Sequence, residues 1–156
     1  MPFYIRVNNK ITLFNFSDFP HSLAEPFNQT SPEDENYNCI AWAYGDSQNW
    51  YWPTNKGYLP SGIPRIRTLQ AFIELFESIR YKECGMNGDH EDGYEKIAIY
   101  CNAQGLPTHA ARQLKDGLWT SKLGNFLDVS HSIQAMSNGN YGDIAIYMKR
   151  LQEQNV

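Results

Sequence analysis

The second half of the chain most strongly limits the possible folds, because it consists of short apolar segments separated by turn signals. Residues 94–101 and 108–114 have the composition of two strands, with Asn102-Ala-Gln-Gly105 as the turn between them. Asp116-Gly117 is a two-residue hairpin signal in front of a third segment over 118–124. A last apolar segment over 143–149 predicts a further strand. These features predict an antiparallel meander over 94–150.

The first half predicts helices. Ser31-Pro32 is a helix-start signal, and the apolar residues over 36–44 end at Gly45, a residue suited to a C-cap. Thr68 is placed to cap a second helix, in which apolar residues recur at helical spacing: Leu69, Phe72, Ile73, Phe76 and Ile79. A helical turn is expected near 128–136. Helices followed by strands indicate an α+β fold, with the helices packed on a C-terminal antiparallel sheet of about four to five strands.

The length predicts a single domain over 1–156. A chain of 156 residues buries roughly two-thirds of the surface that it exposes when unfolded, so it needs no metal or disulfide to stabilise a core. Within the domain we expect an N-terminal arm over 1–30, a helical part with an aromatic loop over 31–80, and the sheet over 94–150.

Composition excludes several classes of protein. A net charge of -4 without a basic cluster argues against nucleic acid as a partner. The sequence contains no apolar run long enough to span a membrane and no cleavable signal pattern, which predicts a cytoplasmic protein or one exported without a cleaved signal peptide. The three cysteines lack zinc spacing, so we expect free thiols and no metal site. No cofactor motif is present, and the oligomeric state is left open.

Cys39 is the candidate nucleophile, because it falls near the predicted start of the first helix. Unpaired amide groups at a helix start lower the pKa of a thiol and favour the thiolate. The alternative is an inert core cysteine, since free cysteine is among the most buried residue types.

His109 is the candidate base. With Asp116-Gly117 as a two-residue turn, His109 faces Gly124 and shares a face with Thr120 and Lys122, while Ser121 lies on the other face. A third polar group is expected to orient the imidazole. Asp128 ranks first and His131 is the other chemically suitable candidate, whereas Ser121 would need a different register.

Further residues are expected to support this site or to bind substrate: Asn38, Trp42, Trp52, Ser121 and Lys122. The tryptophans at 42, 50 and 52 are placed to line a cleft. The aromatic loop over 50–58 also supports an alternative function, a non-catalytic interaction module of the immunity or adaptor type, because Tyr and Trp anchor protein interfaces.

Several motifs resemble those of an uncharacterised bacterial family of small proteins: Tyr37-Asn-Cys39-Ile-Ala-Trp42-Ala, Gly93-Tyr-Glu-Lys-Ile-Ala98, His109-Ala-Ala-Arg-Gln113 and Trp119-Thr-Ser-Lys-Leu-Gly124. A helix-borne cysteine followed by a histidine on the second strand of an antiparallel sheet is also similar in architecture to papain-like thiol enzymes of the NlpC/P60 and CHAP type. The resemblance implies a cysteine-dependent hydrolase or amidotransferase, such as a peptidase, amidase or deamidase. Its substrate would be a protein, a peptide or another amide, with Cys39 as nucleophile and His109 as general base.

Overall fold

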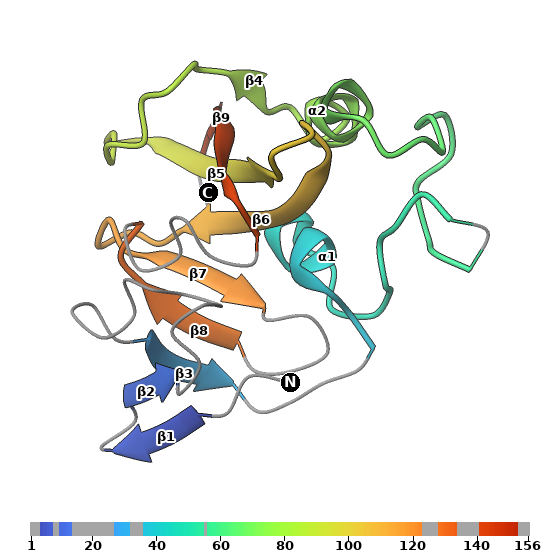
Figure 1. The fold of residues 1–156 in the computed structure, drawn as a ribbon. Coiled ribbons are helices and arrows are strands. Elements are labelled where there is room, and N and C mark those ends of the chain that lie inside the picture. The colour runs from blue at the N-terminus through green and yellow to red at the C-terminus, as the bar shows by residue number, and fades with distance from the viewer. Residues whose placement is uncertain are drawn as a thin grey trace.

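The computed structural model describes residues 4–7, 10–13, 27–31, 36–54, 56–122, 128–133 and 141–152. Its nine strands form one open sheet in the order β1-β2-β3-β8-β7-β6-β5-β9-β4, and every neighbouring pair is antiparallel (Figure 1). The strands are β1 Tyr4–Val7, β2 Lys10–Leu13, β3 Phe27–Ser31, β4 Lys82–Glu83, β5 Tyr94–Cys101, β6 Pro107–Gln113, β7 Trp119–Lys122, β8 Asp128–His131 and β9 Asp143–Leu151.

Two helices precede most of the sheet, α1 over Cys39–Tyr44 and α2 over Leu69–Glu77. Gly45 ends α1 in the left-handed conformation, and Thr68 caps α2 by accepting a hydrogen bond from the Ala71 N–H, so both of these predictions are confirmed. The start predicted at Ser31 is wrong, because Ser31 ends β3 and Asn38 caps α1 instead.

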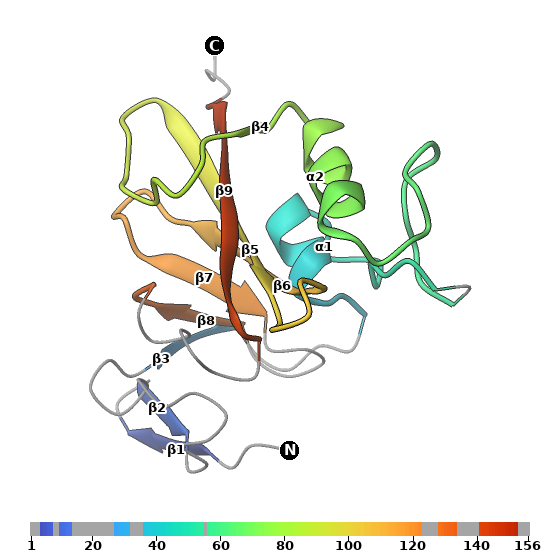
Figure 2. The same ribbon diagram turned by 45° about the horizontal axis from the view of Figure 1, so that its top comes forward.

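The helices lie beside one another on one face of the sheet, next to β5 and β6 (Figures 1 and 2). The core is the layer between them, in which Ile40 and Phe76 from the helices meet Ile97, Ala110 and Met148 from the strands. This arrangement confirms the α+β class. No helix in the described part of the chain is long and apolar enough to cross a membrane.

The predicted meander is present as β5, β6 and β7, but its hairpin register is different. The Leu114 N–H donates to the Leu118 carbonyl, and Gly117 adopts a φ of 88° between them. The loop therefore contains three residues rather than two, a hairpin type in which a glycine takes the left-handed position. As a consequence Gln113 pairs with Trp119 instead of Thr120.

Among the described residues the sheet has nine strands rather than four to five, and the additional strands come from two places. Part of the predicted arm forms β1 to β3, and β3 joins the sheet by pairing with β8. The segment expected to be helical from residue 128 is instead strand β8 over Asp128–His131. Pairing with β3 on one side and β7 on the other overrides its weak local preference. Residues 134–140 lie outside the described part.

Candidate functional site

The start of α1 is fixed by Asn38, whose side chain makes three hydrogen bonds. Its Oδ1 accepts from the N–H groups of Ala41 and Tyr51, each at 3.1 Å, and its Nδ2 donates to the Tyr51 carbonyl at 2.7 Å. One buried side-chain amide thus caps the helix and also binds the backbone of Tyr51. The next residue along the chain, Cys39, is therefore held in a defined position.

The Cys39 thiol lies against the edge of β6. The backbone amides of Ala110, Ile40 and Cys39 itself lie close enough to its sulfur to lower the pKa of the thiol. A backbone N–H projects sideways from a strand, in the plane of the sheet. The described pairing of β6 with β7 consists of Arg112–Thr120 and Gln113–Trp119 and stops short of Ala110. The thiol thus lies beside β6 beyond the paired stretch, next to the residue that follows His109.

The pKa of this thiol differs from the sequence-based expectation. Burial raises it to about 11, and the three N–H groups and the Lys122 ammonium lower it only in part. Cys39 is 5% exposed, so the cost of desolvating a thiolate exceeds the stabilisation by the helix start. Cys39 is therefore a protonated thiol at neutral pH.

His109 is fully buried on the opposite face of β6 from Ala110. Its Nε2 lies 2.9 Å from Ser121 Oγ, and the same hydroxyl lies 2.7 Å from His131 Nε2. His131 Nδ1 is in turn 2.7 Å from the Ser132 carbonyl oxygen. We call this chain of groups, from His109 through Ser121 and His131 to Ser132, the imidazole relay.

Hydrogen-bond chemistry sets the direction of every proton in the imidazole relay. Because a carbonyl only accepts, His131 Nδ1 carries the proton that binds the Ser132 oxygen. Burial lowers the pKa of His131 to about 4, so its ring is neutral and its Nε2 accepts from the Ser121 hydroxyl. The Ser121 oxygen then accepts from His109 Nε2–H. Burial and the neighbouring His131 also hold the pKa of His109 well below 6.5, which leaves its Nδ1 as a bare lone pair.

That lone pair has no hydrogen-bond partner within the described part of the chain. Buried polar atoms are rarely left in this state, and exceptions are found at catalytic positions. His109 Nδ1 is thus a base whose acceptor site is not used by the fold.

Two tyrosines enclose the His109 ring. Tyr141 stacks on it with the ring centres 4.0 Å apart and 5° between the planes, and Tyr100 meets it edge-on at 5.2 Å. The Thr108 hydroxyl donates to the Tyr141 carbonyl and so fixes this segment to β6. The next residue, Gly142, has a φ of +79°, and a Cβ there would lie 2.1 Å from the Cys101 carbonyl oxygen, so only glycine lets the chain pass this close.

A cavity of about 220 Å³ lies beside Cys39. Cys39 and Tyr141, the ring stacked on His109, both contribute to its wall. Its remaining lining residues are Asn38, Trp50, Trp52 and Thr108. Trp52 packs edge-on against Phe72 and lies under the Arg67 guanidinium at 5.2 Å, while Trp50 is 38% exposed. Two of the three predicted tryptophans therefore line the cavity.

The third tryptophan, Trp42, supports the helix instead. Its Nε1 donates to Thr120 Oγ1 at 3.3 Å, and the Arg112 guanidinium lies 4.4 Å from its ring centre. Lys122 is fully buried, with its ammonium 5.0 Å from the centre of the Tyr37 ring. Thr120 and Lys122 thus lie on the helix side of the sheet, not on the face of His109 as predicted.

The remaining candidates have different outcomes. Ser121, expected on the other face, is the group that binds His109 Nε2, and the ranking of Asp128 as the first candidate for the third group stays a prediction. Asp128 begins β8 and pairs with Lys122, and its side chain lies outside the described residues. Gly124, which was expected to face His109, also lies outside the described residues. Sequence reasoning missed Tyr141 and Ala110, because no local pattern marks a ring or an amide that acts through tertiary contact.

The described residues contain no cluster of three or more His, Cys, Asp or Glu side chains that could hold a metal ion. All three cysteines are free thiols, as predicted. Burial raises the pKa of Cys84 and of Cys101 as well.

The fold and the site thus define a small α+β protein in which Cys39 of α1 and Tyr141, the ring stacked on His109 of β6, line one cavity beside an antiparallel sheet. Residues 28–149 match a family model described as a domain of unknown function, DUF7689, and the chain belongs to this family. Neither a curated protein nor a solved structure matches the chain.

Proposed function

We propose that this protein is a cysteine-dependent hydrolase or amidotransferase in which Cys39 is the nucleophile and His109 is the general base. The observation that carries the proposal is the state of His109. It is a fully buried imidazole whose Nε2 proton is bound by the imidazole relay and whose Nδ1 lone pair has no partner among the described residues. The Cys39 thiol lies near Ala110, the next residue of β6. A structural core histidine would have both nitrogens satisfied.

The reaction follows from these positions. Cys39 sulfur attacks an amide carbonyl carbon while its proton moves to His109 Nδ1. The tetrahedral intermediate collapses, His109 returns the proton to the leaving nitrogen, and an amine or ammonia departs from a thioester on Cys39. Water, deprotonated by His109, then attacks the thioester and regenerates the thiol with a carboxylic acid as product. In an amidotransferase an amine takes the place of that water.

The high pKa of the thiol defines how this chemistry starts. Because the pKa of Cys39 is near 11 and the pKa of His109 is held well below 6.5, the resting pair is a neutral thiol and a neutral imidazole. Proton transfer therefore accompanies attack on the substrate instead of preceding it. The buried Lys122 ammonium and the Ala110 N–H favour the negative charge that develops on sulfur.

The papain-like architecture suggested by the sequence fits this assignment, and we propose a protein, peptide or other amide as substrate. The cavity wall formed by Trp50 and Trp52 suits an apolar group next to the reacting bond.

The proposal is tested with p-nitrophenyl acetate, a small activated ester that acylates catalytic thiols. The wild-type protein is expected to release a burst of one p-nitrophenol per chain, with the acetyl group mapped to Cys39 by mass spectrometry. Cys39→Ala abolishes the burst. His109→Gln slows it by about 10²-fold or more, the usual contribution of a general base.

Cys84→Ser is the matched control, since Cys84 is partly exposed and far in sequence from the site. It should leave the burst unchanged. Acetylation of Cys84 ahead of Cys39, or an equal rate in His109→Gln that folds normally by circular dichroism, would contradict the proposal.

Exposed aromatic residues favour a second candidate, the interaction module. Trp50 is 38% and Tyr58 44% exposed on the same loop. Large exposed rings of this kind anchor partners. If this function is correct, Cys39→Ala has full biological activity and Trp50→Ala does not.

A further inference from the structure

A second cavity, also of about 220 Å³, lies at the C-terminal end of α1, whereas Cys39 is the first residue of that helix. The end of α1 meets the start of β5 and the ends of β6 and β9 there. No residue lines both this cavity and the one at Cys39. The volume is below the roughly 300–1,000 Å³ of typical small-molecule sites, so the cavity suits a small ligand or the terminal group of a larger one.

Arg112 of β6 lies in the wall of this cavity and is partly buried. Its guanidinium lies over the Trp42 ring at 4.4 Å and makes no hydrogen bond or ion pair with any residue that the structure describes. The other two partly buried arginines of that part of the chain do have acceptors, since Arg67 donates to a backbone carbonyl and Arg150 to a carbonyl and a carboxylate. The N–H groups of a guanidinium lie in its own plane, so a ring beneath it leaves them able to donate. Arg112 thus has hydrogen-bond donors that the fold does not use.

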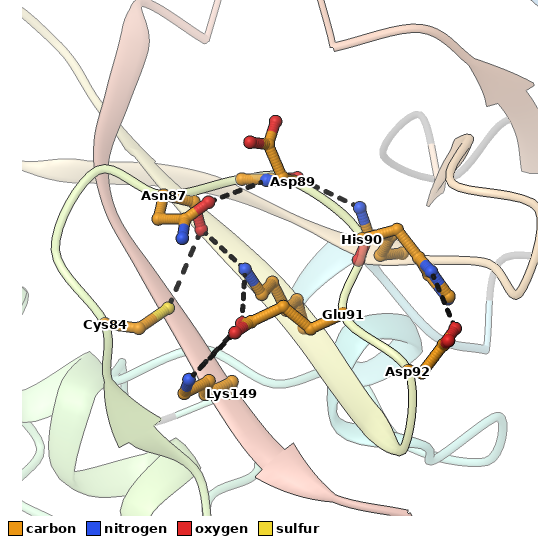
Figure 3. Close-up of polar contacts among 10 residues, drawn as sticks. Cys84, Asn87, Asp89, His90, Glu91, Asp92 and Lys149 are labelled. Carbon is orange, nitrogen blue, oxygen red and sulfur yellow. Dashed lines mark hydrogen bonds and ion pairs between the residues drawn. The ribbon is translucent and has the colours of Figure 1, made fainter.

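The neighbouring carboxylates do not neutralise Arg112. Glu95, in the wall of the cavity, is bound by Arg150 at 2.6 Å. Glu91, on the loop before β5, is shared between Lys96 at 2.8 Å and Lys149 at 3.3 Å, as the close-up of this loop shows (Figure 3). Neither carboxylate forms an ion pair with the Arg112 guanidinium. Its charge is therefore open to an anion from outside the chain.

We propose that this cavity binds a carboxylate group, held by two parallel hydrogen bonds from the Arg112 guanidinium. The fork of N–H groups on an arginine matches the two oxygens of a carboxylate. Because one partly buried cation lacks a partner, the cavity suits a group with a single negative charge. A phosphate dianion would need a second cation, and Lys115, which also lines the cavity, is exposed to solvent that screens its charge.

The rest of the wall indicates what the carboxylate is attached to. Tyr44, Tyr94 and Leu114 bring aromatic and aliphatic groups to the cavity, which suits an apolar body next to the charged end. The carboxylate would belong either to a small apolar organic acid or to the C-terminus of a peptide. The proposal does not depend on the function proposed for Cys39.

Calorimetric titration of the full chain with benzoate and with benzamide tests the proposal, because the two molecules have nearly the same shape and differ in charge. Benzoate is expected to bind saturably and benzamide at least tenfold more weakly. Inorganic phosphate should also bind more weakly than benzoate. These comparisons use the wild-type protein, so they remain valid if a variant folds poorly.

Two substitutions of Arg112 separate its charge from its geometry. Arg112→Gln removes both and should weaken benzoate binding at least tenfold, whereas Arg112→Lys retains the charge beside Trp42, loses the fork and should weaken binding at least threefold. Lys56→Gln is the matched control, since it removes an exposed positive charge that does not line this cavity, and it should leave the affinity unchanged.

An acetylated tetra-alanine peptide, with a free or an amidated C-terminus, distinguishes the two sources of the carboxylate. If the free acid binds more tightly than benzoate and the amide does not bind, the ligand is a peptide C-terminus. If benzoate binds more tightly, the ligand is a small organic acid. The proposal is overturned if benzoate does not bind saturably, if benzamide or phosphate binds as tightly as benzoate, or if Lys56→Gln weakens binding as much as Arg112→Gln.

Discussion

Replacing Ser121 by alanine tests the imidazole relay directly, because one hydroxyl serves both imidazoles. The substitution removes the bonds of 2.9 Å to His109 Nε2 and 2.7 Å to His131 Nε2. It leaves a buried N–H donor and a buried nitrogen acceptor without partners. Each unsatisfied group costs about 1–3 kcal/mol, so the free energy of unfolding should fall by about 2–6 kcal/mol. That is a large fraction of the roughly 5–15 kcal/mol typical of a domain.

The assay is urea unfolding followed by tryptophan fluorescence, with Ser130→Ala as the matched control. Ser130 is 8% exposed on the adjacent strand β8, and its hydroxyl has no hydrogen bond among the described residues. We expect a change within about 0.5 kcal/mol for Ser130→Ala. If the two variants lose the same stability, the imidazole relay does not bind His109 as the structure shows.

A second measurement on Ser121→Ala addresses proton positions. In the wild-type protein, ¹⁵N chemical shifts of the imidazoles should show His109 protonated at Nε2 and His131 at Nδ1. In folded Ser121→Ala the preference of His109 for a proton on Nε2 should weaken. Acetylation of Cys39 by p-nitrophenyl acetate should slow by about tenfold or more. If His109 in the wild-type protein is protonated at Nδ1, that atom has no free lone pair and the proposal that it is the general base is refuted.

Three further predictions concern stability and access. Unfolded imidazoles take up protons below about pH 6.5 and the buried ones do not, so the free energy of unfolding is highest above pH 6.5 and falls as the pH decreases toward 4. His131 alone, with its pKa lowered from 6.5 to about 4, accounts for about 3 kcal/mol. Equal urea midpoints at pH 7 and pH 5 would contradict this prediction. Asn38→Ala loses three buried hydrogen bonds and should cost about 2–4 kcal/mol in urea unfolding, more than the single-bond cap variant Thr68→Ala at about 1 kcal/mol. Trp50→Ala removes a ring from the wall of the cavity at Cys39, so acetylation of Cys39 by p-nitrophenyl acetate should become faster. Tyr58→Ala lies on the same loop but does not line the cavity, so it should not change that rate.

The local signals that were correct are those in which a residue acts on its own neighbours. Thr68 caps α2 and Gly45 ends α1 because a capping oxygen or a left-handed glycine needs only the adjacent turn. The same reasoning failed at Ser31, where the residue lies in strand β3 and its pairing with Asp128 of β8 decides its structure. No local pattern reveals that partner, which is about a hundred positions away.

The pKa of the Cys39 thiol is another property that local sequence signals predict only in part. Position at the start of α1 predicts a lowered pKa for Cys39, and the N–H groups that produce this effect are indeed present. Burial depends on which distant segments pack nearby, however, and Tyr141, about a hundred positions away, lines the same cavity as Cys39. Because desolvation is the larger effect, the pKa rises instead, and the proposed reaction therefore needs a general base that acts during the attack.

A single loop residue decides which side chain of β7 lies next to His109. A two-residue turn at Asp116-Gly117 puts Ser121 on the face opposite His109, and a three-residue turn that includes Lys115 moves every residue of β7 to the other face. Ser121 then lies within hydrogen-bond distance of His109, and Lys122 moves to the helix side, where its charge favours a thiolate at Cys39. Both changes support the proposed function, because one register shift provides an orienting group for the proposed base and a cation near the proposed nucleophile. Lengthening the loop by one residue is therefore expected to disable the site even where the strands still pair.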